Sequence, residues 1–185
     1  EKCNLKFESF QLPGVKLIEP DIHHDSRGYF FESYRYDKFF EEELSMNFIQ
    51  DNEVYSSKDV LRGLHYQLNN PQGKLIRCVR GTILDVAVDI RVDSPTFGKW
   101  LSFQLSDKNK NILYVPEGFA HGYLVKSENS IVSYKCTNFY NKNDEYGIRW
   151  DDLDLKINWG CTKPIVSDRD RNMPLLKNQK FLPKY

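Results

Sequence analysis

The chain has 185 residues, of which 40% are hydrophobic and 28% are charged. This length fits one domain of ordinary size or two very small ones, and the hydrophobic content excludes wholesale disorder. Lysine and arginine together number 26, as do aspartate and glutamate, so the formal net charge is zero. A chain without net charge is a poor candidate for sequence-independent nucleic-acid binding, and we expect no nucleic-acid partner.

Short predicted strands follow one another along most of the chain. They cover residues 15–19, 28–33, 48–55, 60–67, 75–79, 83–91, 100–105, 111–115, 122–125 and 130–137. One helix is predicted at 36–44, where Phe39, Phe40 and Leu44 share a face. The segment from about residue 151 is rich in loop signals. Many short strands joined by tight turns favour a sandwich or barrel, so the sequence predicts an all-β domain with a few short helices.

The predicted strand at 83–91 alternates with a period of two. Apolar side chains occupy one face, and the other face carries Asp85 and Asp89. Carboxylates that face a barrel interior need cationic or histidine partners. The alternative is that this face is solvated, and the period alone does not decide between the two.

Neither a membrane span nor a disulfide framework is expected. No stretch approaches the roughly 20 apolar residues that a membrane helix requires, and the first residues carry no apolar signal-peptide core. We therefore expect a soluble, cytoplasmic protein without a membrane partner. Cys3, Cys78, Cys136 and Cys161 form no C-x-x-C pair, which predicts isolated thiols in a reducing compartment.

Four histidines are the first candidates for chemistry. His23 and His24 lie in a polar segment and are interpreted as residues of a surface turn. His65 lies in a predicted strand, three residues after Arg62. The two side chains point to opposite faces of that strand, unless Gly63 marks a bulge. Taken alone, a histidine in a strand is more often structural than functional.

His121 completes the pattern P-x-G-x-x-H that begins at Pro116. This pattern is similar to the second motif of cupins, which are small double-sheet β-barrels. Metal-binding cupins carry an H-x-H pair in their first motif, where this chain has His65-Tyr66-Gln67 with a single histidine. A transition-metal site needs three or four converging ligands, so no metal is expected.

The remaining motifs favour acid–base chemistry without a cofactor. The chain has no G-x-G-x-x-G, P-loop or G-x-S-x-G pattern. A barrel pocket that holds histidine, lysine, tyrosine and carboxylates is typical of proton transfer. Lys74, at the start of a predicted strand, is a candidate for stabilising negative charge.

Ten short motifs are spread over nearly the whole chain. They are 27–34 (RGYFFESY), 50–53 (QDNE), 60–67 (VLRGLHYQ), 73–75 (GKL), 85–91 (DVAVDIR), 93–98 (DSPTFG), 115–122 (VPEGFAHG), 134–137 (YKCT), 150–152 (WDD) and 167–170 (SDRD). In this order they resemble the dTDP-4-dehydrorhamnose 3,5-epimerase family. The chain departs from the family pattern at Val54, where a small residue such as serine is frequent, and at Arg169, where lysine is common.

The resemblance implies a fold, an activity and an assembly. The implied fold is a cupin-type double-sheet β-barrel (jelly roll), with residues 1–185 as a single epimerase domain that forms a homodimer and needs no cofactor. The implied substrate is a dTDP-linked 4-keto-6-deoxy sugar, inverted at C3 and C5 on the route to dTDP-rhamnose.

The resemblance also implies residue roles. His65 resembles the general base, Tyr134 the general acid, Asp170 the carboxylate that orients His65, and Lys74 the residue near the 4-keto oxygen. The implied substrate contacts are Arg27, Phe30, Glu32, Gln50, Asp51, Asn52, Arg62, Asp85, His121, Tyr140, Glu145 and Arg169, with Tyr140 as the aromatic ring that stacks on the thymine.

Other functions stay open at this point. A relative that inverts only C3 or only C5, or that takes another nucleotide, would carry many of the same motifs. A non-catalytic cupin sugar-binding module would not need His65, Lys74, Tyr134 and Asp170 together. A metal-dependent cupin oxygenase would need more metal ligands than the sequence offers.

Overall fold

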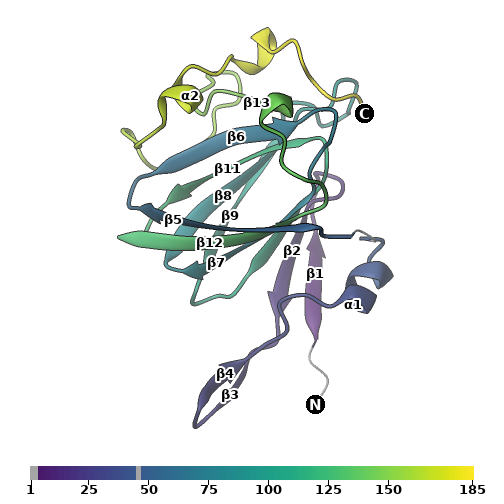
Figure 1. The fold of residues 1–185 in the computed structure, drawn as a ribbon, viewed down its shortest axis with the longest axis vertical. Helices are drawn as coiled ribbons and strands as arrows, with labels where there is room; N and C mark the ends of the chain where they lie inside the picture. Colours follow the sequence, from purple (N-terminus) through teal and green to yellow (C-terminus); the bar gives the residue numbers. More distant parts are fainter. Residues whose placement is uncertain (1–3, 45–46) are drawn as a thin grey trace.

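In a computed structural model, the chain folds into two antiparallel sheets that face each other and close into a barrel (Figure 1). The structure describes residues 4–44 and 47–185. The six-stranded sheet has the order β1 (Leu5–Ser9), β2 (Lys16–Pro20), β10 (Ile112–Val115), β7 (Lys74–Arg80), β12 (Asn129–Cys136) and β5 (Gln50–Ser57). The five-stranded sheet has the order β13 (Glu145–Gly147), β6 (Leu61–Gln67), β11 (Phe119–Val125), β8 (Thr82–Asp89) and β9 (Trp100–Ser106). The predicted all-β, double-sheet barrel is confirmed.

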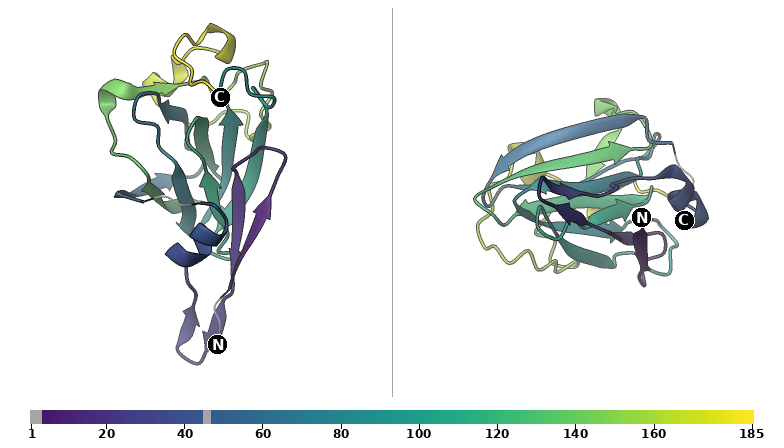
Figure 2. Two further views of the ribbon diagram at one scale, coloured as in Figure 1. Left: turned by 90° about the vertical axis from the view of Figure 1, so that its right-hand side faces the viewer. Right: turned by 90° about the horizontal axis from the view of Figure 1, so that it is seen from below.

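The remaining elements are short. They are the hairpin of β3 (His23–Asp25) and β4 (Gly28–Phe30), the helices α1 (Tyr36–Glu41) and α2 (Asp168–Arg171), and the 3-10 turns η1 (Lys142–Asp144) and η2 (Leu176–Asn178). The β3–β4 hairpin projects from the barrel at the end opposite to α2 (Figures 1 and 2). Within the described ranges, no helix is long and apolar enough to cross a membrane.

An apolar core fills one part of the space between the sheets. Alternate side chains of each strand point inward, and Ile76, Ile83, Leu105, Leu113 and Val132 are all fully buried there. The same alternation points Val86 and Val88 of β8 outward, where they are buried in a second apolar cluster. The strand β8 is therefore covered on both faces, by two separate cores.

The face of β8 that carries Asp85 and Asp89 points into the barrel and is not solvated. The alternation of the sequence had left both possibilities open. Asp85 and Asp89 are both fully buried. Asp89 accepts hydrogen bonds from Arg91, Ser94 and Thr96. Burial raises the pKa of Asp89, but these donors outweigh it and bring the pKa down to about 2.

The C-terminal segment covers the outer face of the five-stranded sheet. Val86 and Val88 pack there against Leu155 and Trp159, and the Trp159 indole Nε1 donates a hydrogen bond to the Trp150 carbonyl over 2.9 Å. Burial of this large apolar surface holds the loop-rich segment in place without regular secondary structure. As a result α2 lies beside β6.

Several element boundaries differ from the sequence-based prediction. The strands β1 and β13 were not predicted: β1 pairs only with β2, and β13 has three residues that take strand geometry by pairing with β6. His23 and His24 lie in β3 rather than in a turn, because they pair with β4. In addition, β11 begins three residues before the predicted start, which places His121 inside a strand.

Two further expectations concern single side chains. The helix α1 ends at Glu41, and Phe40 is 60% exposed, so it does not share the buried face of Phe39 as predicted. Cys78 and Cys136 are buried inside the barrel, whereas Cys3 lies outside the described residues.

Candidate active site

Two adjoining cavities open into the polar part of the barrel. Their volumes are about 460 Å³ and about 250 Å³, and His65, Lys74 and Tyr134 line both. The polar residues that line the first cavity also include Arg62, His121, Tyr123, Ser167, Arg169 and Asp170. Those of the second also include Gln50, Asn52, Gln72, Tyr140 and Glu145. Eleven residues implied by the resemblance thus lie around one connected space.

A β-bulge at Gly63 brings Arg62 and His65 to the same side of β6. The pairing with β11 shifts between two pairs of facing residues, Arg62 with Tyr123 and His65 with His121. Gly63 has a φ of 124°. A Cβ atom at this position would lie 2.6 Å from the Gly122 Cα, which leaves room for glycine alone. The bulge that the sequence left open at Gly63 is present, and it turns Arg62 into the cavity.

The His65 ring is held by a buried carboxylate from the far end of the chain. The His65 Nε2 atom lies 2.7 Å from Asp170 Oδ1, and the Asp170 side chain is only 5% exposed. The other oxygen, Oδ2, accepts a hydrogen bond from the Gly63 backbone N–H over 3.1 Å. Because a carboxylate accepts hydrogen bonds, Nε2 carries the proton and Nδ1 is left as the basic nitrogen.

The pKa of Asp170 reflects this environment. Burial raises the pKa, but the His65 ring and the Gly63 and Ser167 hydrogen bonds outweigh burial, so the pKa lies below its ordinary value. Ser167 caps α2 by accepting a hydrogen bond from the Asp170 backbone N–H. The carboxylate is therefore ionised and fixed, as a partner that orients a histidine base must be.

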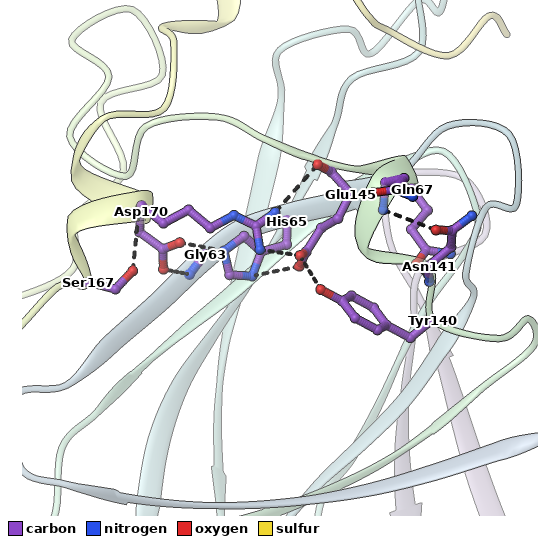
Figure 3. Close-up of polar contacts among 10 residues, drawn as sticks. Gly63, His65, Gln67, Tyr140, Asn141, Glu145, Ser167 and Asp170 are labelled. Atoms are coloured by element: carbon purple, nitrogen blue, oxygen red, sulfur yellow. Dashed lines mark hydrogen bonds and ion pairs between the residues drawn. The ribbon is translucent and has the colours of Figure 1, made fainter.

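Glu145 faces the other nitrogen of the His65 ring (Figure 3). Its Oε1 atom lies 4.0 Å from His65 Nδ1. Its Oε2 atom accepts a hydrogen bond from the Tyr140 hydroxyl over 2.8 Å and forms an ion pair with the Arg169 guanidinium. The Gln67 side chain accepts a hydrogen bond from the Asn141 backbone N–H and so fixes the loop that carries Tyr140.

Lys74 and Tyr134 extend from neighbouring strands of the opposite sheet. Burial lowers the pKa of Lys74, while the nearby Cys136, Glu145 and Asp85 oppose this. Burial raises the pKa of Tyr134, and the Arg62 charge opposes the rise. At neutral pH the phenol is therefore protonated and able to donate a proton.

A second histidine–carboxylate pair lies beside the first. The His121 Nε2 atom is 2.8 Å from Asp85 Oδ1, and the two side chains are 8% and 0% exposed. Asp85 does not itself line either cavity. It lies behind His121 and acts on the cavity through that ring.

Four implied substrate contacts lie away from both cavities. Arg27 and Phe30 are exposed on the β3–β4 hairpin, where Arg27 pairs with Asp25 at 2.6 Å. Glu32 follows this hairpin in the chain. Asp51 points outward from β5 and pairs with Lys135 at 3.0 Å. Within a single copy of the chain, none of the four reaches His65.

Three polar residues that line the cavities were not predicted as site residues. Tyr123 stands two residues after His121 and therefore shares its face of β11. This spacing would have predicted that Tyr123 lines the same cavity. Ser167 stands three residues before Asp170 in an N-cap pattern at the start of α2. Gln72 gave no signal, because only tertiary structure brings its loop to the second cavity.

The site as a whole is built for proton transfer. Among residues 4–44 and 47–185, no group of three or more histidine, cysteine or acidic side chains is arranged to hold a metal ion. The carboxylate-bound His65 ring, the protonated Tyr134 phenol and the buried Lys74 side chain line both cavities. These features define a jelly-roll enzyme of the acid–base class.

Comparisons with known proteins give the family. The family model for dTDP-4-dehydrorhamnose 3,5-epimerase matches residues 9–178. The dTDP-4-dehydrorhamnose 3,5-epimerase of Methanothermobacter thermautotrophicus is 46% identical over 97% of this chain and 100% of its own length. A Legionella pneumophila epimerase solved with dTDP-4-keto-L-rhamnose is 41% identical, with a TM-score of 0.94 over 98% of this chain and 99% of its own. A 3'-monoepimerase from Streptomyces bikiniensis solved with dTDP-quinovose is 33% identical, with a TM-score of 0.89 over 95% of this chain and 92% of its own.

The chain belongs to the dTDP-4-dehydrorhamnose 3,5-epimerase family. It is an isomerase that acts on a nucleotide-linked carbohydrate.

We predict that the contribution of Asp170 to stability depends on pH. Because its folded-state pKa lies below the ordinary value of about 3.9, the ionised carboxylate stabilises the fold above that value. The contribution is lost as the pH falls through the folded-state pKa. The urea midpoint of the wild type should therefore exceed that of Asp170→Asn from pH 5 to pH 7, and the gap should shrink as the pH falls below about 3.9. Asp168→Asn, an exposed change in the same helix, is the control, and a constant gap for Asp170→Asn would contradict the prediction.

Proposed function

We propose that the enzyme inverts C3 and C5 of dTDP-4-keto-6-deoxyglucose, in the biosynthesis of dTDP-rhamnose. The observation that carries the proposal is that His65, Lys74 and Tyr134 line both cavities. Residues 1–185 act in this proposal as a single epimerase domain. A dTDP-linked substrate is charged and does not cross a lipid interior unaided, so we also place the reaction in the cytoplasm.

The chemistry follows from the 4-keto group. A proton on a carbon next to a ketone is acidic because its removal gives an enolate. C3 and C5 both adjoin C4, so one base can serve both positions. His65 Nδ1 removes the proton, and Asp170 stabilises the imidazolium that forms. The Lys74 ammonium group stabilises the negative charge on the enolate oxygen.

Inversion needs a proton from the opposite face of the sugar ring. His65 extends from the five-stranded sheet and Tyr134 from the six-stranded sheet, so a sugar between them meets the base on one face and the phenol on the other. Removal by His65 followed by delivery from Tyr134 inverts the carbon.

The second cavity suits the nucleotide. The Tyr140 ring provides a surface for stacking on the thymine. Gln50 and Asn52 offer amide groups for its polar edge. In the adjoining first cavity, Arg62 and Arg169 are positively charged and suit the diphosphate, as does His121 when it donates a hydrogen bond.

We predict that His65→Ala abolishes hydrogen exchange at both C3 and C5, whereas Tyr134→Phe retains exchange but loses inversion. Without the base no enolate forms. Without the phenol, the enolate still forms and takes a proton back from His65 on the original face. Acid and base groups typically contribute roughly 10²–10⁴-fold, so both losses are measurable by proton NMR in heavy water.

The same experiment separates the rival functions. Deuterium at only one carbon would indicate a mono-epimerase, and a binding module would exchange neither. Near-normal exchange by His65→Ala, or normal inversion by Tyr134→Phe, would contradict the proposed roles. Tyr36→Phe, which changes an exposed tyrosine on α1, is the matched control for Tyr134→Phe.

We also propose that the enzyme is a homodimer. Tyr29 and Phe30 on the hairpin and Tyr55 on β5 are each more than half exposed, and exposed aromatic groups of this kind favour protein contacts. Arg27, Phe30 and Glu32 lie outside the cavities of their own chain. In a two-fold dimer the hairpin of one copy is able to supply these residues to the site of the other.

Mixed dimers test this assembly. Arg27→Ala and His65→Ala should each reduce activity alone. If the hairpin acts in trans, a dimer with one copy of each variant has one site that carries both changes and one intact site, so a statistical mixture regains about one quarter of wild-type activity. Sedimentation at micromolar concentration should show a dimer. A monomer, or no regain on mixing, would contradict the proposal.

We predict that EDTA leaves the activity unchanged. Each of the two cavity histidines engages a carboxylate through Nε2, and the proposed chemistry uses only these groups, Lys74 and Tyr134. Turnover should be the same before and after dialysis against the chelator. Loss of activity that a divalent ion restores would overturn the metal-free mechanism.

A further inference from the structure

The two arginines that line the first cavity are held in different ways. Arg169 forms an ion pair with Glu145. Within the described part of the chain Arg62 has no carboxylate partner, and the one hydrogen bond of its side chain runs from Nε to the Ser56 hydroxyl oxygen over 3.1 Å. An anion that binds Arg169 must compete with a carboxylate, whereas the charge of Arg62 is free for a ligand.

Ser56 reaches Arg62 from the opposite sheet. Alternate residues of β5 point inward, so Asn52 and Val54 line the cavities. Ser56, two residues further along the strand, is only 4% exposed. Arg62 lies on β6, which belongs to the five-stranded sheet. The hydrogen bond therefore crosses the interior between the two sheets, and its acceptor is buried.

Tyr123 packs into the same corner of the barrel. It faces Arg62 across β6 and β11. Burial raises the pKa of Tyr123 to about 12, and the Arg62 charge and the Ser56 hydroxyl both oppose the rise. The Ser56 hydroxyl is therefore placed between a guanidinium that donates to it and a buried phenol.

The direction of this hydrogen bond decides which part of the guanidinium stays free. A guanidinium is planar, and with Nε engaged its two Nη groups remain as a pair of donors. A phosphate group accepts such a pair in a bidentate contact. An arginine side chain loses conformational freedom when a ligand orders it, so a side chain that is already held binds the ligand more tightly.

We propose that Ser56 is a positioning residue that holds Arg62 as the preformed anchor for the diphosphate of the substrate. Ser56 itself lines neither cavity and acts only through the direction of the guanidinium. The inference rests on the proposed function, in which the ligand is a dTDP-linked sugar.

Calorimetric titration tests this role. Ser56→Ala frees the guanidinium, so the Kd for dTDP should rise about tenfold, whereas the Kd for thymidine, which has no phosphate, should change by less than about twofold. With the 4-keto sugar substrate, KM should rise in the same way while kcat stays within about twofold of the wild-type value, because the acid–base groups are untouched.

Two comparisons separate this role from a general effect on packing. In the Arg62→Ala background, Ser56→Ala should cause no further loss of dTDP affinity, because the group that it orients is gone. Ser130→Ala is the matched control. Ser130 is the fully buried serine opposite Ser56 on β12, and its hydroxyl has no hydrogen-bond partner among the described residues. This variant should keep the wild-type Kd for dTDP.

The outcomes distinguish the positioning role from the proposed function. A wild-type Kd for dTDP in Ser56→Ala, or an equal further loss in the Arg62→Ala background, would overturn the positioning role and leave the proposed function intact. A wild-type enzyme that binds dTDP no more tightly than thymidine would refute the proposed function, and the role of Ser56 with it.

Discussion

The hydrogen bond between His65 and Asp170 joins residues 105 positions apart. Its geometry depends on the bulge in β6, on the cap of α2 and on the packing of the C-terminal segment. A buried carboxylate without partners would cost several kcal/mol. Here the carboxylate is satisfied by the His65 ring and by the Gly63 N–H, which the bulge in β6 exposes. Asp170 reaches this position because α2 is capped by Ser167 and because the C-terminal segment packs on the outer face of the sheet. The His65 ring is therefore oriented by contacts that extend well beyond the cavity.

The interior of the barrel is divided between an apolar core and a polar site. Burial shifts the pKa values of two cavity groups in opposite directions. It raises the pKa of the Tyr134 phenol, and it lowers the pKa of the Lys74 ammonium group, a shift that nearby Cys136, Glu145 and Asp85 oppose. The buried Asp85 belongs to the same network, since it holds His121 and influences Lys74. Such a network is consistent with a site in which protons move between fixed groups.

The β3–β4 hairpin carries a recognisable sequence motif but lies away from the cavities of its own chain. Arg27 and Phe30 stand in one of the most recognisable motifs of the chain, yet the hairpin projects from the opposite end of the barrel (Figure 1). A motif shows that a residue type is required, but not in which copy of the chain it acts. The same applies to Asp51, whose place on the outward face of β5 follows from the alternation of side chains along a strand.

The sequence by itself determined the fold class and most strands, because alternating apolar patterns and turn residues are local signals, and its motifs singled out the residues that we propose for acid–base chemistry. It also indicated the bulge at Gly63, since a glycine in the interior of a strand often marks a bulge or a close approach of the backbone. Tertiary structure alone decided that both faces of β8 are buried, that Asp85 lies behind His121, and that β13 exists as a strand. It also placed Gln72 and Glu145 beside His65 and the hairpin residues away from it. These features depend on contacts between segments far apart in the chain, and no local pattern encodes which distant partner a side chain will meet.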